Sequence, residues 1–76
     1  MNKARRDRLR EAMSYLDMAS AIVTDIKYCE QDNLDNTPDN LQMSFAYEKR
    51  EDCISNLEDA YDGISSAIDR INDAMA

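Results

Sequence analysis

The chain has 76 residues, a formal net charge of −7, two cysteines, one glycine and neither histidine nor tryptophan. This length fits a single domain, 1–76, that buries only a small core, so a partner subunit is the expected source of further stability. The acidic balance argues against a general nucleic-acid binder. The cysteine and histidine counts exclude a disulfide-rich scaffold and leave a zinc site without its usual ligands.

The first predicted element is a helix over about 4–30. Good helix formers dominate its first half, and apolar residues recur every seven positions. The segment 1–10 carries five basic residues against one acid, and no apolar stretch follows it, which argues against a signal peptide. Three apolar columns run along the helix: Leu9, Leu16 and Val23; Ala12, Ala19 and Ile26; Tyr15, Ile22 and Cys29.

The segment 31–43 is expected to connect two helices. It is rich in Asp and Asn, which favour turns because their side chains compete for backbone hydrogen bonds. Thr37 followed by Pro38 is typical of a helix start. A short helical turn at 38–42 before a long helix from Ser44 matches the lengths of two paired helices best, and a continuous helix from Pro38 is the alternative.

The second long helix is predicted over about 44–75. Its heptad repeat has three apolar columns rather than the two of a simple coiled coil, so the helix should pack against more than one neighbour. The columns are Cys53, Ala60, Ala67 and Ala74; Ile54, Tyr61, Ile68 and Met75; Leu57, Ile64 and Ile71.

These elements predict an all-α fold, an antiparallel two-helix hairpin that self-associates into a helical bundle, with a dimer favoured. Pairing places the basic start of the first helix beside the acidic end of the second, where Arg5 and Arg8 can reach Asp69 and Asp73. In an end-aligned hairpin, residues whose numbers sum to about 80 face each other. The predicted oligomer interface consists of Leu9, Leu16, Val23, Ile26, Leu57, Tyr61, Ile64, Ile68 and Ile71.

Two clusters have both a structural and a functional interpretation. Cys29 and Cys53 should be near neighbours, and two small buried apolar residues are favoured over a redox pair in a reducing cytosol. The aromatic and methionine residues around the connector are expected to fill the closed end of the hairpin rather than form a binding patch. The residues of this second cluster are Tyr28, Met43, Phe45 and Tyr47.

No catalytic, cofactor or metal site is predicted, because the chain has no histidine, no glycine-rich loop and no serine or cysteine beside a base. No apolar run is long enough for a membrane span, so we expect a cytoplasmic protein without a membrane partner. The one distinctive surface is an acidic face on the second helix. A solvated surface is its simplest interpretation, and a binding site for a basic protein is the alternative. It consists of Asp52, Asp59, Asp62, Asp69 and Asp73.

Most of the chain resembles a group of small proteins carried by phages and mobile elements of Firmicutes and other gut bacteria. The resemblance lies in the basic "NKARR" start at Asn2–Arg6, an "NxPxxLQ" connector at Asn36–Gln42, and a second helix similar to "AIxxLEEAxxxIxxAI". The group has no assigned activity, so no site residues transfer. The resemblance implies a mobile-element context in a bacterial cytosol, where small acidic proteins often inhibit host defence systems.

Three functions follow as expectations. The first is a non-enzymatic accessory protein that binds a basic host protein, in the manner of an anti-CRISPR protein or a nucleic-acid mimic, without binding nucleic acid itself. The second is a structural module whose activity is oligomerisation. The third and weakest is a bundle that binds a nucleotide through the N-terminal arginines.

Overall fold

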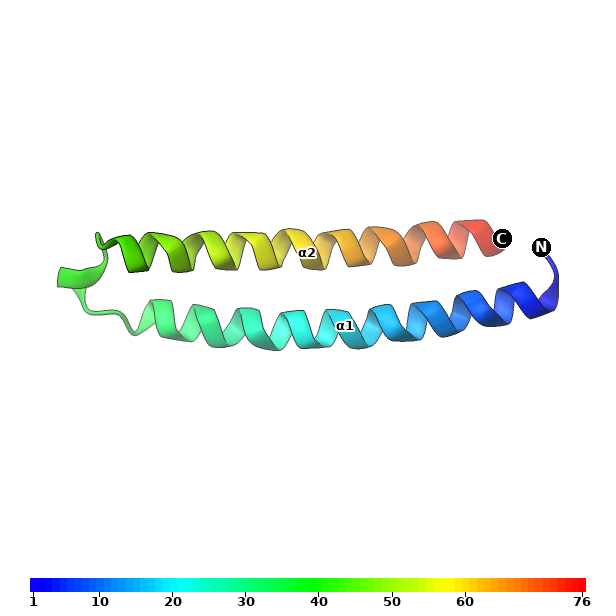
Figure 1. The fold of residues 1–76 in the computed structure, drawn as a ribbon, viewed down its shortest axis with the longest axis horizontal. Helices are drawn as coiled ribbons and strands as arrows, with labels where there is room; N and C mark the ends of the chain where they lie inside the picture. Colours follow the sequence, from blue (N-terminus) through cyan, green and yellow to red (C-terminus); the bar gives the residue numbers. More distant parts are fainter.

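The computed structural model describes residues 1–76 and shows an all-α antiparallel hairpin. Helix α1 spans Lys3–Asp35, a short 3-10 helix η1 spans Asp39–Leu41, and helix α2 spans Phe45–Met75. The two long helices lie side by side, with both termini at one end and the connector at the other (Figure 1). Neither helix contains an apolar stretch long enough to cross a membrane.

Polar side chains define where both long helices start. Asn2 caps α1, its Oδ1 accepting a hydrogen bond from the Arg5 N–H at 2.9 Å. Ser44 caps α2 in the same way, with its Oγ 3.2 Å from the Tyr47 nitrogen. Such caps satisfy backbone donors that have no partner within the helix. Of the two starts considered for the second helix, the structure therefore has the one at Ser44 and not the one at Pro38.

Helix α1 continues five residues beyond the predicted end at residue 30. The extension brings Leu34 against α2, where only 9% of it stays exposed, and Gln31 donates to Asp35 at 3.0 Å along the helix surface. Burial of a leucine stabilises the extra turn despite its Asp and Asn residues, whose helix propensity is low. The connector is correspondingly shorter than 31–43, and η1 stands where a helical turn at 38–42 was expected.

Apolar side chains meet between the helices in a seam that repeats every three and four residues, as in an antiparallel coiled coil. Only Leu34 and Ile54 are buried, at 9% and 6% exposure, and the other seam residues are half-buried. We call this set the inner seam. It comprises Leu9, Met13, Leu16, Val23 and Leu34 of α1, and Ile54, Leu57, Ile64, Ile68 and Ile71 of α2.

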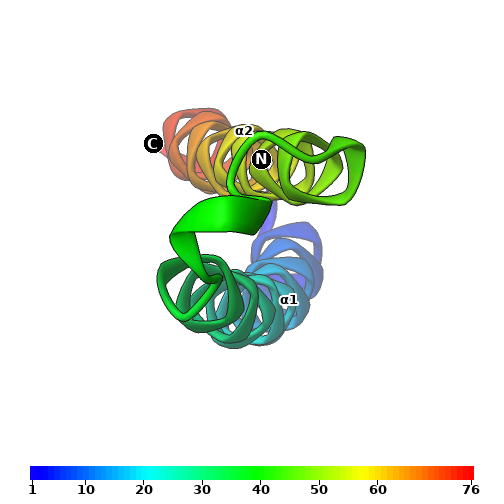
Figure 2. The same ribbon diagram turned by 90° about the vertical axis from the view of Figure 1, so that its left-hand side faces the viewer.

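The molecule is a rod rather than a sphere. It measures 59 × 15 × 13 Å, and its radius of gyration of 17.4 Å exceeds the roughly 11 Å of a compact domain of this length. The end-on view shows the two long helices side by side, with the connector and its η1 in front of them and no third long helix (Figure 2). Each helix consequently has one covered stripe and a broad surface left open.

Candidate protein-interaction surface

Helix α1 carries a second apolar stripe that does not face α2. Its large side chains are well exposed, at 59% for Tyr15, 60% for Ile22 and 47% for Ile26. Cys29 continues the stripe and is also exposed. The spacing of these residues is that of a packing seam, because positions three, four and seven apart share one side of a helix. The stripe is therefore built like the inner seam but has no partner within the chain.

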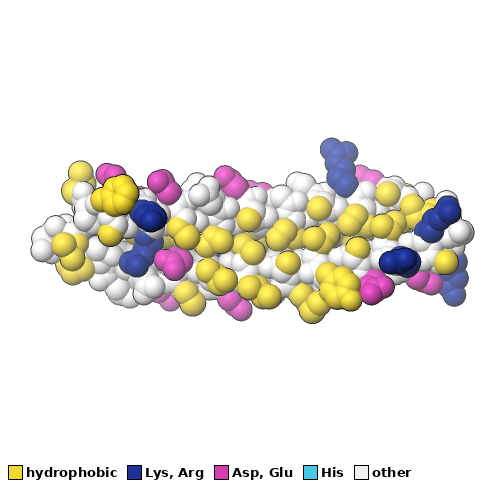
Figure 3. Space-filling view, in the orientation of Figure 1, with side chains coloured by type: hydrophobic (Ala, Val, Ile, Leu, Met, Phe, Trp, Pro, Cys, Tyr) yellow, Lys and Arg dark blue, Asp and Glu magenta, His cyan; other side chains and the backbone are white.

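Helix α2 borders this stripe with small residues. Cys53 and Ala67 directly precede the inner-seam residues Ile54 and Ile68, and Ala60 lies in the same heptad column as both. Ile26 holds the corresponding flanking position in α1. In an antiparallel pair, such flanking positions lie on the same side of both helices. Figure 3 shows apolar side chains running almost continuously along the groove between the helices and over the adjoining surface of α1. We call the surface formed by Tyr15, Ile22, Ile26 and Cys29 with Cys53, Ala60 and Ala67 the apolar face.

Gly63 adds open space to α2 near the small residues. A Cβ atom built on Gly63 would have no neighbouring atom within 4 Å, so the hairpin itself does not require glycine there. Glycine inside a helix costs roughly 1 kcal/mol relative to alanine. The hairpin thus carries a helix-weakening residue that its own packing leaves unexplained.

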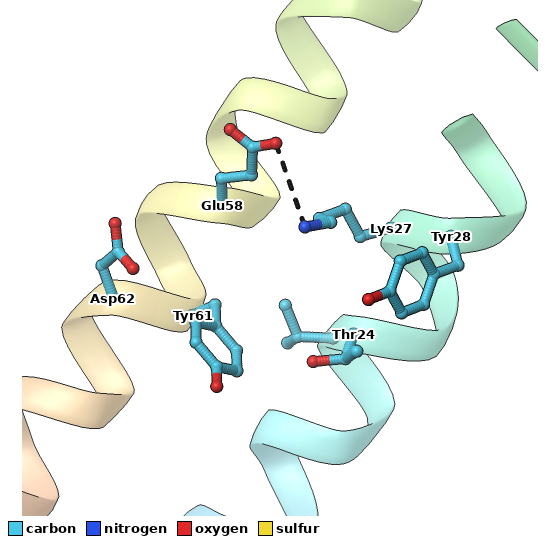
Figure 4. Close-up of a pocket in the computed structure, with 7 residues that line it drawn as sticks. Thr24, Lys27, Tyr28, Glu58, Tyr61 and Asp62 are labelled. Atoms are coloured by element: carbon cyan, nitrogen blue, oxygen red, sulfur yellow. Dashed lines mark ion pairs between the residues drawn. The ribbon is translucent and has the colours of Figure 1, made fainter. Parts of the chain in front are cut away.

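The opposite side of the hairpin has a polar groove of about 430 Å³ between α1 and α2. Its residues include Thr24, Tyr28, Tyr61 and Asp62, and Lys27 lies across it with its Nζ 3.9 Å from Glu58 Oε1 (Figure 4). The same Nζ lies 5.4 Å from the centre of the Tyr28 ring, within cation–π range. The lysine amine therefore already has two partners within the hairpin, and the groove is polar where the other side is apolar.

The predicted oligomer interface divides into two groups in the structure. Most of it lies half-buried within the inner seam and is therefore shared between the chain's own helices. Ile26 and Tyr61 are exposed. Residues missing from the predicted interface are Tyr15, Met18 and Ile22, all exposed on α1. The half-buried group comprises Leu9, Leu16, Val23, Leu57, Ile64, Ile68 and Ile71.

The acidic face is solvent-exposed along its whole length. None of its five carboxylates forms an ion pair or a side-chain hydrogen bond, and all five residues are exposed. The structure contains no cluster of acidic, cysteine or histidine side chains arranged to hold a metal ion. The surface therefore presents separate carboxylates along a rod. They are those of Asp52, Asp59, Asp62, Asp69 and Asp73.

The expected ion pairs at the open end of the hairpin are not formed. Arg5 and Arg8 make no ion pair with Asp69 or Asp73, and Arg6 instead donates from Nε to the Met75 carbonyl at 3.2 Å. The arginine reaches the carbonyl because it lies beside the inner seam, whereas those aspartates point away from the seam. Elsewhere Arg50 pairs with Glu30 at 3.2 Å, in keeping with the end-aligned pairing.

Two burial predictions are wrong. Cys29 and Cys53 are free and exposed, because both lie on the apolar face rather than in the inner seam. Three of the four residues around the connector do not fill the closed end of the hairpin either, since Tyr28 is 60%, Met43 88% and Phe45 80% exposed. Tyr47 is half-buried. Leu34 is the residue buried nearest the connector, and it takes the place expected for an aromatic ring.

Comparison with protein-family models, curated proteins and solved structures found no match to this chain. The likeness to proteins of phages and mobile elements therefore stays a prediction. The apolar face and the acidic face are the two surfaces of the hairpin with a distinct chemistry.

Proposed function

We propose that this protein is a non-enzymatic protein-binding module whose working surface is the apolar face. The observation that carries this proposal is the exposed stripe formed by Tyr15, Ile22 and Ile26, which repeats the spacing of a helix-packing seam without a partner in the chain. Exposed apolar stripes of this kind bind helices, because an amphipathic helix anchors at three- and four-residue steps.

The test compares two double variants of α1 that carry the same added charge. Ile22→Asp with Ile26→Asp places two carboxylates on the apolar face. Ser14→Asp with Ala21→Asp places two on an exposed surface away from it. We expect the first variant to lose both self-association, measured by light scattering, and capture of proteins from a bacterial lysate, while the second keeps both. Equal behaviour of the two variants, or no binding by the wild type, would refute the proposal.

A second candidate function rests on the acidic face. Five exposed carboxylates without ion-pair partners favour a basic protein over nucleic acid, because like charges repel phosphate and opposite charges accelerate association. Inhibition of a host defence protein, implied by the resemblance to mobile-element proteins, would use this surface. The alternative to a binding role is that the carboxylates of the acidic face only keep an oligomeric module soluble.

Charge-neutralising variants separate these possibilities. The triple variant Asp59→Asn, Asp62→Asn, Asp69→Asn removes three charges from the acidic face. Asp17→Asn, Asp25→Asn, Asp32→Asn removes three from exposed, unpaired positions of α1. If the acidic face binds a basic partner, the first variant associates more slowly and the second does not. Identical association rates would leave the carboxylates a solubility role.

A further inference from the structure

The hairpin exposes more surface than its mass warrants. Its accessible area is 5767 Å², whereas a compact protein of 8.7 kDa exposes roughly 4,700 Å². The difference of about 1,000 Å² is comparable to the roughly 800 Å² that each partner buries in a stable interface. A partner could cover this area on the apolar face while removing few polar groups from water.

The apolar face is complementary to itself. Large side chains project from α1, including Tyr15 and Ile22, and small ones line α2 beside them, including Ala60 and Gly63. In a two-fold dimer both subunits use the same surface. The apolar stripe of α1 in one subunit must therefore pack against some part of the apolar face of the other subunit. A second copy of the chain therefore supplies both the large side chains of α1 and the small residues of α2 that they can pack against.

Two orientations of the two-fold axis are open to hairpins stacked face to face. An axis along the helices places α1 on α2 of the second copy, antiparallel, with both connectors at one end. An axis across the helices places α1 on α1 and α2 on α2, with connectors at opposite ends. The first sets large residues over small ones at both contacts. The second pairs large with large and small with small, so that the two contacts require different interhelical distances.

We propose that a second copy of this chain covers the apolar face, with α1 of each subunit packed antiparallel on α2 of the other. This inference rests on the proposed function and names the partner of that surface. The arrangement has a covalent signature, because Cys29 and Cys53 both belong to the apolar face. The Arg50–Glu30 contact places the two cysteines within about 3 Å of the same level along the rod, since a helix rises 1.5 Å per residue. Cys29 of one subunit should therefore meet Cys53 of the other.

The experiment is mild oxidation of the full chain at tens of micromolar with copper phenanthroline. Joining two Sγ atoms releases two protons and passes two electrons to two Cu(II) ions. We expect a covalent dimer on a non-reducing gel from the wild type, and its loss in Cys29→Ser alone and in Cys53→Ser alone. Mixing these two variants should restore it, because each supplies the thiol that the other lacks. Sedimentation equilibrium without oxidant gives the mass of the native assembly.

Each other outcome overturns the arrangement. A covalent dimer from either single variant alone means that like cysteines meet, which the axis along the helices does not allow. A disulfide confined to the monomer, or a sedimenting dimer that cannot be cross-linked, contradicts the predicted meeting of unlike cysteines. A monomeric mass in sedimentation equilibrium would contradict the proposal that a second copy covers the apolar face. In that last case, capture of another protein that still depends on Ile22 and Ile26 would leave the proposed function standing.

Discussion

The inner seam and the α1 part of the apolar face both carry large apolar side chains at helix-packing spacing, yet their environments are opposite. Ile54 is 6% exposed in the inner seam, and Ile22 is 60% exposed on the apolar face. The difference arises from helix pairing alone, because a hairpin can cover only one stripe of each helix. The comparison teaches that heptad columns show where a helix packs, while the identity of the neighbour depends on the three-dimensional arrangement. Substitutions should therefore act differently on the two surfaces.

The largest expected effect comes from placing a charge in the inner seam. Ile64→Asp sets a carboxylate among half-buried apolar side chains without a cationic partner, and we expect a loss of more than about 2 kcal/mol and collapse of the helical signal in circular dichroism. Ile22→Asp is the matched control, because its carboxylate would face solvent in the hairpin. If the control loses as much helicity as Ile64→Asp, the hairpin does not fold without a partner on the apolar face.

Truncation of an isoleucine to alanine should affect stability differently on the two surfaces, because only the apolar face is expected to respond to protein concentration. Ile54→Ala removes buried methyl groups and should cost about 2–4 kcal/mol of unfolding free energy at every protein concentration. Ile22→Ala should change stability by less than about 0.5 kcal/mol in dilute solution, where an exposed position matters little. At high concentration its cost should rise if the apolar face is covered. Urea unfolding at two concentrations provides the measurement, and a cost for Ile22→Ala that does not change with concentration would contradict the distinction.

Gly63→Ala should stabilise the isolated hairpin. The added methyl group meets no atom within 4 Å, so the helix gains up to about 1 kcal/mol of propensity without a clash. Ser66→Ala, at an exposed position one turn further along α2, is the control and should give a smaller gain. The thermal midpoint in dilute solution measures both. A lower midpoint for Gly63→Ala alone would show that the monomer already packs something against this position.

The sequence was sufficient to predict the two helices and their antiparallel pairing, because the heptad columns are long and unambiguous. It was not sufficient to place the end of α1. Leu34 is separated from the preceding apolar residue by the polar stretch 30–33, so its burial against α2 cannot be anticipated from local propensity. Helix ends depend on such tertiary contacts, whereas helix centres follow from periodicity.

The apolar face was recognised in part. The column Tyr15, Ile22 and Cys29 can be read directly from the sequence. The sequence did not show, however, whether this column or a neighbouring one faces the second helix. One heptad column of α1 that faces α2 contains Ser20 and Lys27 as well as apolar residues. A count of apolar residues along the sequence therefore does not identify this column as a packing surface. Lys27 is accommodated there because its amine lies against Tyr28 and Glu58. Polar residues in a seam thus concealed which stripe faces α2.

The smallest expected effect concerns the polar end of the inner seam. Glu30 and Arg50 occupy seam columns that hold apolar residues elsewhere, and their side chains lie 3.2 Å apart at 32% and 40% exposure. Partial burial limits screening, but both groups remain in contact with water, so a double-mutant cycle with Glu30→Gln and Arg50→Gln should give a coupling of about 0.5–1 kcal/mol. The Lys27–Glu58 pair is the control at 3.9 Å and should couple more weakly. Both couplings should shrink in high salt. A larger coupling for the longer pair would mean that desolvation, rather than distance, governs the ion pairs of this seam.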